Sequence, residues 1–332
     1  MKVRLQILSF IFYSILFVYN AGSQDIENRL DTSIIDIEQF NKPRFYTTLG
    51  IGSLIYGSGT YALVKYWYSD YGFSNFHLFD DKREWLYMDK IGHIYTAYNQ
   101  SSVMFDGARW TGMKKNSSLW FGVTMGMLLQ STIEVLDGFS PKWGFSIADM
   151  SANIGGAGMF FVQQKLWGEQ KIVMKVSSGV RNYGNSSILS TNGSGTTNLN
   201  NRADELFGKS FPERFLKDYN AQIYWLSFNL SSLSGKESIP KWLNLSVGYS
   251  GQDMFGGFSN QWTDSSGYDF NIENSISRYG QFYLTPDIDF RRIHVKSQFL
   301  KTLFKAMNLI KFPMPGIEIN TRGVIKLHYL VR

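Results

Sequence analysis

The spacing of apolar residues changes once along this chain, near Gly168, and the change separates two halves of different structure. Before Gly168, polar and apolar residues recur at intervals of three and four, which is the spacing of one face of an α-helix. After Gly168, apolar and polar residues alternate, which is typical of strands with one dry and one wet face. The sequence therefore predicts an α+β protein, with an N-terminal bundle of about four helices followed by a C-terminal antiparallel sheet or partial barrel.

Four segments of the first half have the composition of helices. Each has about 20 residues, enough to cross a bilayer if it is sufficiently apolar. Ser146 is a suitable N-cap for the last segment, because Asp149 follows three residues later as in a capping box. The first segment contains Gly50, Gly52, Gly57 and Gly59, small residues that would let another helix approach closely, and the alternative is a Gly-rich loop or strand. Gly122 and Gly126 lie four apart in the third segment. The segments are 46–67, 85–105, 117–136 and 146–167. Whether they are embedded in a membrane or only packed together stays open.

Five segments of the second half alternate as strands do. They are 171–180, 221–230, 243–249, 281–290 and 317–328. A closed outer-membrane barrel needs at least about 8 strands, so we expect an open sheet, with a barrel-like set of membrane strands as the rival. Their polar residues, such as Asp287, Asp289 and His328, are expected on a solvated face. The stretch 299–310 has one apolar helical stripe, which predicts an amphipathic helix packed on the sheet or lying on a membrane surface.

Residues 1–23 are typical of a secretory signal peptide. Lys2 and Arg4 precede a short apolar core, and small residues at 21–23 suit cleavage before Gln24. The alternative is an uncleaved N-terminal membrane anchor, but the apolar core of this segment is short for a helix that spans a bilayer. Beyond the signal we expect a polar leader at 24–43, a helical domain at 44–170 and a β-rich domain at 171–332. The β-rich domain is expected to contain a flexible loop at 184–210.

The composition indicates the cell envelope and excludes several classes of function. Removing the signal takes away two positive charges, so the mature net charge is 6 − 2 = +4, and there is no basic block for nucleic acid. The absence of cysteine excludes disulfides, thiolate catalysis, cysteine zinc sites and acylation at an N-terminal cysteine. Aromatic residues make up 16% and charged residues 18%, and aromatic side chains with a polar tip favour membrane–water boundaries. We expect an exported protein of the periplasm or outer membrane of a Gram-negative bacterium, with a membrane as its partner.

Three of the predicted helices each carry a polar pair with four-residue spacing, which places both members on one helix face. The pairs are Asp89 with His93, Gln130 with Glu134, and Asp149 with Asn153, and Asp137 follows Glu134. The arrangement predicts either a buried polar site or a polar seam that fixes the register of the helices.

If the pairs converge, one imidazole lies among several carboxylates. Crowded carboxylates raise the pKa of at least one of them and keep a nearby imidazole cationic. This is a setting for general acid–base chemistry, with His93, Glu134 and Asp137 as catalytic candidates. Acid–base chemistry of this kind would point to an enzyme acting on an envelope lipid or glycan.

The same groups suit a divalent metal ion. Carboxylate oxygens with one imidazole favour Mg²⁺ or Mn²⁺ over Zn²⁺. The candidate ligands are Asp89, His93, Glu134 and Asp149. The structural alternative is a seam in which Gln130 and Asn153 hydrogen-bond between helices. The residues alone leave open whether the chain is an enzyme or a structural or binding protein.

The run from Asp89 to Lys175 resembles the YfiM-like proteins, a bacterial family of uncharacterised predicted periplasmic lipoproteins. The matching motifs are D-K-x-G-H from Asp89, Glu134 with Asp137-Gly138, and G-F-S-x-x-D-x-x-A-N-x-x-G from Gly144. Their order more distantly resembles VanZ-like membrane proteins, and the β-rich remainder is similar to longer envelope versions from Bacteroidetes-type bacteria. The resemblance implies export and a helical core that bears these residues, and it implies no activity. The chain departs from the lipoprotein pattern because it has no cysteine, so no acyl anchor is expected.

Overall fold

A computed structural model of the chain describes residues 39–65, 72–179 and 181–331. The predicted signal peptide and most of the predicted leader lie outside the described residues. The chain forms two compact units. The helical unit contains the described residues up to Asp81 together with His93–Gln170 and Ile293–Met307. The sheet unit contains Lys82–Gly92, Lys171–Arg292 and the residues from Asn308 onward. This architecture confirms the predicted α+β class.

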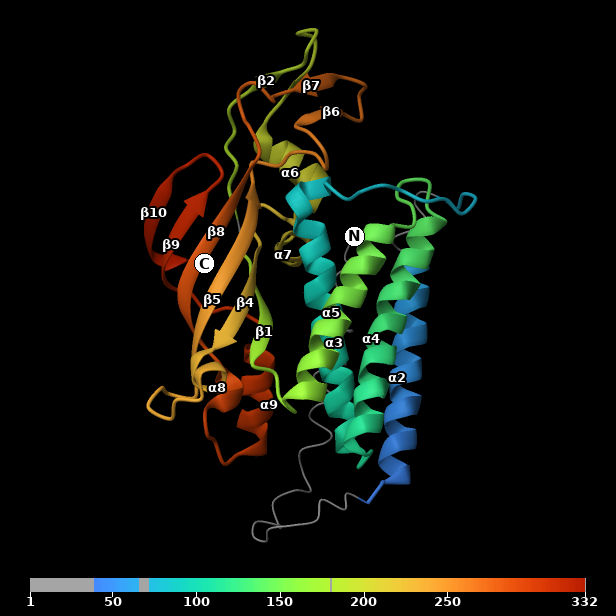
Figure 1. Ribbon diagram of the computed structural model, residues 1–332. Coiled ribbons are helices and arrows are strands. Elements are labelled where there is room, and N and C mark those ends of the chain that lie inside the picture. Colours follow the sequence, from blue (N-terminus) through green and yellow to red (C-terminus); the bar gives the residue numbers. More distant parts are fainter. Residues whose placement is uncertain (1–38, 66–71, 180, 332) are drawn as a thin grey trace. The chain divides into compact units, whose positions relative to one another are not determined.

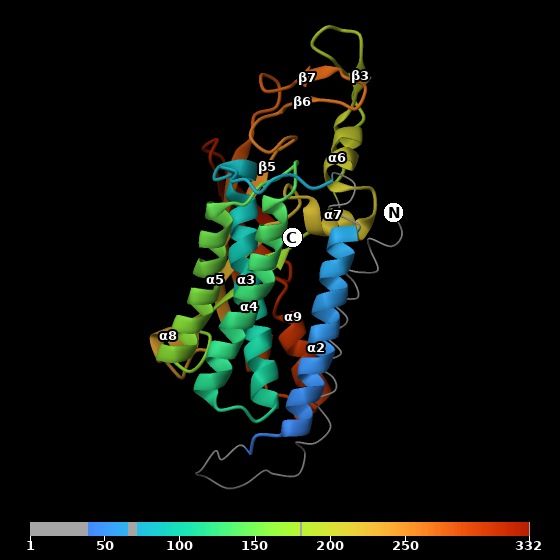
Figure 2. The ribbon, with the colours of Figure 1, turned by 90° about the vertical axis from the view of Figure 1, so that its right-hand side faces the viewer.

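Long helices form the helical unit, and Figure 2 shows α3, α4 and α5 side by side. The long helices are α2 (Lys42–Leu63), α3 (Met88–Trp110), α4 (Lys115–Gly138) and α5 (Ile147–Leu166), and α9 (Gln298–Met307) is shorter. Pro43 lies in the first turn of α2, so α2 begins inside the segment predicted as leader. The Ser146 hydroxyl caps α5 by accepting a hydrogen bond from the Asp149 amide, which confirms the predicted cap.

Glycines bring the helices of this unit into backbone contact. A Cβ on Gly122 would lie 2.7 Å from the carbonyl oxygen of Ser101, and one on Gly126 would lie 3.0 Å from the Ser101 amide nitrogen. On α5, a Cβ on Gly156 would overlap the carbonyl oxygen of Ile94. Only glycine permits such approach, so these three positions set how closely α4 and α5 pack against α3.

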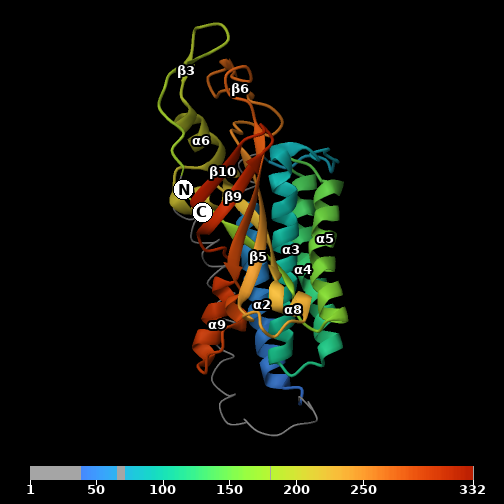
Figure 3. The ribbon, with the colours of Figure 1, turned by 60° about the vertical axis from the view of Figure 1, so that its left-hand side comes forward.

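The sheet unit is built on six antiparallel strands in the order β1-β4-β5-β8-β9-β10, which Figures 1 and 3 show. The strands are β1 (Ile172–Ser177), β4 (Ile223–Asn229), β5 (Leu243–Gln252), β8 (Tyr279–Ile288), β9 (Met314–Asn320) and β10 (Ile325–Val331). They overlap the segments that alternate in the sequence, but the segment 317–328, predicted as one strand, contributes to the two strands β9 and β10. The sheet is open, and β1 and β10 are its edges. Val176 on the β1 edge exchanges backbone hydrogen bonds with Leu309 and Lys311.

Smaller elements complete the sheet unit. The stretch 184–210, predicted as a loop, contains the hairpin of β2 (Ile188–Leu189) and β3 (Thr196–Thr197) and the whole of helix α6 (Leu199–Phe207). The other elements are α7 (Phe211–Lys217), α8 (Leu230–Ser234), η3 (Phe290–Arg292) and the hairpin of β6 (Gln261–Thr263) with β7 (Asp269–Asn271). Asn198 caps α6 through its side chain, a local signal that the loop prediction overlooked.

The two faces of the sheet differ in polarity, although the buried face also carries the apolar cluster of Ile223, Trp225, Tyr283 and Val331. One face, called here the apolar sheet face, consists of two rows of residues that cross all six strands. The rows are Met174, Leu226, Val247, Leu284, Ile317 and Leu327, and Val176, Tyr224, Tyr249, Phe282, Ile319 and Ile325. Most of these side chains on β4, β5, β8, β9 and β10 are exposed. The opposite face is buried and largely polar, with Lys175, Ser227, Ser246, Asp287, Glu318 and Asn320 among its residues.

The predicted solvated position of the polar strand residues is therefore wrong. Asp287 and Asp289 are buried, and His328 is half-buried with its Nε2 atom 2.7 Å from Oε2 of Glu318. Alternation requires that the two faces of a strand differ, but it does not determine which face is turned inward. The three-dimensional surroundings of the sheet decide that.

A strained turn anchors the beginning of α3 to the sheet unit. In η2 (Glu84–Tyr87), Trp85, Leu86 and Tyr87 all have positive φ values, of 51°, 51° and 67°. This left-handed conformation costs about 1–2 kcal/mol for each residue that is not glycine. The Trp85 ring packs 5.6 Å from the Tyr219 ring, and the Tyr249 hydroxyl donates to the Leu86 carbonyl. These contacts offset the strain and fix the chain immediately before α3.

Candidate functional site

His93 is the centre of a polar cluster inside the helical unit. It lies near the beginning of α3, and Glu134 from α4 and Asp149 and Asn153 from α5 surround it. The last three residues are buried, whereas 18% of the His93 side chain is exposed. The structure thus brings together one member of each of the three polar pairs, with Asn153 as a fourth residue. His93 is the most exposed of the four.

The two nitrogens of the His93 ring have different surroundings. Nδ1 lies 3.1 Å from Oδ1 of Asn153 and 3.7 Å from Oε1 of Glu134. Nε2 lies 3.7 Å from Oδ1 of Asp149. A carbonyl oxygen only accepts hydrogen bonds, so Nδ1 carries the proton when the ring is neutral. The lone pair of the neutral ring is then on Nε2, on the side of Asp149.

The capping residue of α5 connects the carboxylates of the cluster. The backbone amide of Ser146 donates to Oε2 of Glu134 at 3.4 Å, and the Ser146 hydroxyl donates to Oδ1 of Asp81 at 2.5 Å. The N-terminus of a helix carries a partial positive charge that stabilises nearby anions. The first turn of α5 therefore holds Glu134, Asp149 and Asp81 in a buried position. Asp81 has no periodic signal in the sequence, and only the fold brings it here.

The side-chain amide of Asn153 makes a hydrogen bond through its oxygen, to the His93 ring. Its side chain is buried, and its Nδ2 atom has no hydrogen-bond partner among the described residues. A buried amide nitrogen without a partner is costly, by about 1–3 kcal/mol. Such a group marks a place where a further acceptor completes the site.

The remaining sequence candidates lie at the margins of this cluster. Gln130 is buried on α4 and donates to Oε1 of Gln100 on α3 at 2.8 Å, a hydrogen bond between two helices. Asp137 is half-buried near the end of α4, one turn beyond Glu134. Asp89 lies one turn before His93 on α3, in the part of that helix that belongs to the sheet unit.

Asp89 also has partners in the sheet unit. Its Oδ1 accepts a hydrogen bond from the Tyr219 hydroxyl at 2.7 Å, and its Oδ2 lies 2.9 Å from Nζ of Lys90. Burial raises the pKa of Tyr219 well above its ordinary value, and the negative charge of Asp89 raises it further. Asp89 therefore helps to fix the first turn of α3, the helix that carries His93.

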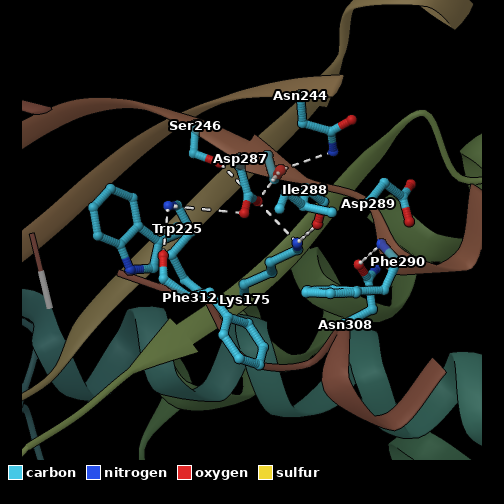
Figure 4. Close-up of polar contacts among 12 residues, drawn as sticks. Lys175, Trp225, Asn244, Ser246, Asp287, Ile288, Asp289, Phe290, Asn308 and Phe312 are labelled. Atoms are coloured by element: carbon cyan, nitrogen blue, oxygen red, sulfur yellow. Dashed lines mark hydrogen bonds and ion pairs between the residues drawn. The ribbon is translucent and has the colours of Figure 1, made fainter. Parts of the chain in front are cut away.

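A second polar cluster, which the sequence did not reveal, lies on the buried face of the sheet. Figure 4 shows Lys175 and Ser246 beside Asp287. Nζ of Lys175 lies 2.9 Å from Oδ2 of Asp287 and donates to the Ile288 carbonyl at 2.7 Å. The Ser227 and Ser246 hydroxyls donate to the same carboxylate oxygen. Nζ of Lys311 lies 3.8 Å from Oδ1 of Asp287.

Burial perturbs both lysines of this second cluster. It lowers the pKa of Lys175, against the raising effect of Asp287. It lowers the pKa of Lys311 to about 8, and Asp287 again opposes the shift. Every polar atom of the Asp287 carboxylate faces a cation or a hydroxyl donor. Asp287 thus links the two buried lysines of the sheet core.

The fold and the helical cluster define a class: an α+β protein whose helical half carries a buried polar site. The chain is similar to the family described as Predicted periplasmic lipoprotein (DUF2279), whose model matches residues 77–165. These residues form about a quarter of the chain and include His93, Glu134, Asp149 and Asn153. No curated protein and no solved structure matches the chain significantly.

The match supports an exported, periplasmic location. It confirms the resemblance to predicted periplasmic lipoproteins at this level. The finer resemblance to YfiM-like and VanZ-like proteins stays a prediction. The chain differs from a lipoprotein in having no cysteine that could be acylated.

Proposed function

We propose that the protein is a membrane-associated protein of the cell envelope whose helical unit binds a divalent cation beside His93. The observation that carries the proposal is the 3.7 Å separation between Nε2 of His93 and Oδ1 of Asp149. Two ligand atoms at this separation can share one ion at about 2.0–2.2 Å from each. Glu134, whose Oε1 lies 3.7 Å from Nδ1 of His93, is the further acidic candidate within the helical unit.

The surroundings of the His93 ring support this role. A histidine that binds a metal through one nitrogen usually donates from its other nitrogen to an oxygen, which fixes the ring. Asn153 and Glu134 supply oxygens on the Nδ1 side. Carboxylates outnumber imidazoles in the cluster, so an oxygen-preferring ion such as Mn²⁺ or Mg²⁺ suits it better than Zn²⁺.

Manganese binding by the purified full chain in detergent tests the proposal, measured by equilibrium dialysis and titration calorimetry. We expect one ion for each chain, and at least about a tenfold loss of affinity in His93→Ala and Asp149→Asn. Gln130→Leu is the matched control, since Gln130 is buried on the same bundle but bonds to Gln100. Unchanged manganese binding in His93→Ala would overturn the cation site.

The polarity of the helical unit supports the membrane part of the proposal. Among the described residues, α4 is the one helix long and apolar enough to cross a membrane, and 28% of its most apolar stretch is buried. Its exposed side chains include Trp120, Leu128 and Val135, while its buried residues include Gln130 and Glu134. A core helix of a protein in water has the opposite distribution. Recovery of the mature protein wholly in the soluble periplasmic fraction, without detergent, would contradict membrane association.

A second candidate function is acid–base catalysis on an envelope lipid or glycan, with His93 as the base. The fixed Nδ1 side favours it, because a base oriented by a hydrogen bond to its second nitrogen is the usual catalytic arrangement. Glu134 would hold the ring and Asp137, one turn away, is the remaining acidic candidate. An activity screen on envelope extracts with Glu134→Gln and His93→Ala separates the two functions. Turnover that depends on His93 in metal-free protein would favour the enzyme.

A further inference from the structure

We propose that the apolar sheet face contacts the hydrocarbon of a lipid bilayer. This inference deepens the membrane part of the proposed function and rests on it. It names a second surface, in the sheet unit, and assigns acyl chains as its occupant.

The first argument is the composition of the two rows, which are largely exposed from β5 to β10, whereas Met174 on β1 and Tyr224 on β4 are buried. Across six strands, both rows of the apolar sheet face contain only aliphatic and aromatic residues and methionine. Leu327 is 82% exposed, and Val247, Phe282 and Ile319 are exposed as well. Soluble monomers rarely expose a continuous apolar patch larger than a few hundred Å². A face with this composition and exposure indicates a non-aqueous neighbour.

The second argument is the opposite face, and it distinguishes lipid from a protein partner. A sheet that folds in water turns its apolar face inward and leaves its polar face outside. Here Lys175 and Asp287 are buried in contact with each other, and Gln281 and Asn320 both donate to Oε1 of buried Glu318. Polar residues inside and apolar residues outside are the pattern of strands that face lipid. A protein that meets its partner only after folding in water has no need of this inversion.

A shallow groove on the apolar sheet face has the right chemistry for an acyl chain. It encloses about 570 Å³ and is lined by Leu245, Leu284, Pro286, Ile317, Leu327 and Tyr329, among others. Apolar side chains dominate its surface. Volumes of this order accommodate small ligands, and an acyl chain needs no polar contact within the groove.

The edges of the sheet limit how it can lie in lipid. Unpaired backbone groups are costly in hydrocarbon. The β1 edge is bonded to Leu309 and Lys311, whereas β10 is the open edge among the described strands. We therefore expect the face to rest on the acyl chains of one leaflet, with the β10 edge at the level of the headgroups, where water satisfies it.

Nitroxide accessibility in vesicles tests the proposal, and the absence of native cysteine makes single labels straightforward. The full chain is reconstituted in vesicles of phosphatidylethanolamine and phosphatidylglycerol. Labels are placed at Val247→Cys and Leu327→Cys, and at Ser265→Cys, an exposed position between β6 and β7, as the water-facing control. Oxygen concentrates in hydrocarbon and a nickel chelate stays in water. We expect a several-fold higher ratio of oxygen to nickel collisions at Val247 and Leu327 than at Ser265.

Two results would overturn the proposal. One is a Leu327 label as accessible to nickel as the Ser265 label. The other is a Leu327 label protected from both reagents in lipid-free protein that cross-links as a dimer, which would assign the face to a second copy. If the protein still fractionates with membranes in either case, the sheet proposal fails and the membrane part of the proposed function stands. Recovery in the soluble periplasmic fraction would contradict both.

Discussion

The two buried polar clusters of this protein are built differently. In the sheet unit, Nζ of Lys175 lies 2.9 Å from the Asp287 carboxylate. A second lysine and two serine hydroxyls supply the other partners of that carboxylate. In the helical unit, the carboxylates of Glu134 and Asp149 stay 3.7 Å from the two nitrogens of His93. The first cluster joins opposite charges at contact distance. The second has more acids than bases, and its central ring is partly exposed.

This difference separates a structural role from a binding role. A buried ion pair with complete hydrogen bonding has no capacity left for a ligand, and removing one partner leaves an uncompensated charge. A ring nitrogen held at 3.7 Å from a carboxylate leaves room for an ion between them. We therefore expect the sheet cluster to govern stability and the helical cluster to govern binding.

The largest effect is expected for Asp287→Asn. The substitution leaves Lys175 and Lys311 buried without their shared carboxylate, which should lower the free energy of unfolding by about 3–5 kcal/mol. Denaturant unfolding in mild detergent measures it. The control is Asp106→Asn, which breaks the exposed ion pair with Lys305 and should cost about 1 kcal/mol or less. An equal decrease in the free energy of unfolding for both variants would contradict a structural role of the sheet cluster.

Glu134→Gln sharpens the comparison from the helical side. The change keeps the shape of the side chain and removes the charge beside Nδ1 of His93. Manganese affinity should fall about 10–100-fold, as for other groups that orient a metal-binding histidine. Titration calorimetry measures the affinity and thermal unfolding of the metal-free protein provides the comparison. If Glu134→Gln destabilises the protein as much as Asp287→Asn and leaves the manganese affinity unchanged, the helical cluster is structural like the sheet cluster.

Two neighbouring glycines of α5 offer a matched pair for the packing that supports the site. Gly156→Ala introduces a Cβ against the Ile94 carbonyl and should cost about 1–3 kcal/mol, because α3 and α5 must separate. Gly155 has open space at its Cβ position. Gly155→Ala should therefore raise stability by up to about 1 kcal/mol through helix propensity. Chemical denaturation distinguishes them, and a neutral Gly156→Ala would show that close approach of the helices is not required.

The last prediction is a pH dependence that belongs to the sheet cluster. Burial lowers the pKa of Lys311 from 10.5 to about 8. Between these values the unfolded chain keeps a proton that the folded chain has lost, so the free energy of unfolding should rise with pH across this window. Urea unfolding at a series of pH values measures the slope. Lys311→Met should reduce it, and a slope that persists unchanged would assign it to other groups.

Local features of the fold were predictable because they depend on residues close in sequence. The Ser146 cap needs only the Asp149 amide three residues later. Close approach at glycine was predicted on the wrong helix, because it depends on a neighbouring segment: nothing among the described residues lies within 4 Å of a Cβ at Gly50, Gly52 or Gly57, whereas Gly122 and Gly126 approach Ser101. The alternating segments became strands, since a period of two matches the geometry of the extended backbone.

Long-range features were not predictable. The sheet cluster joins Lys175 to Asp287, and the register of four strands decides that contact. Asp81 reaches the helical cluster only because the connection before α3 lies against the cap of α5. Periodicity places Lys175 and Asp287 on strands but does not pair them, and Asp81 belongs to no periodic segment.

The amino-acid order specifies the period of each half and the pairing of polar residues on helix faces, because both follow from the local geometry of the backbone. The folded chain is needed to tell which sheet face is buried and which ring nitrogen of His93 faces which carboxylate. These features depend on the medium around the chain and on contacts between distant segments, which no local pattern contains. A repeat of two residues specifies two different faces, and their surroundings select the one that is buried.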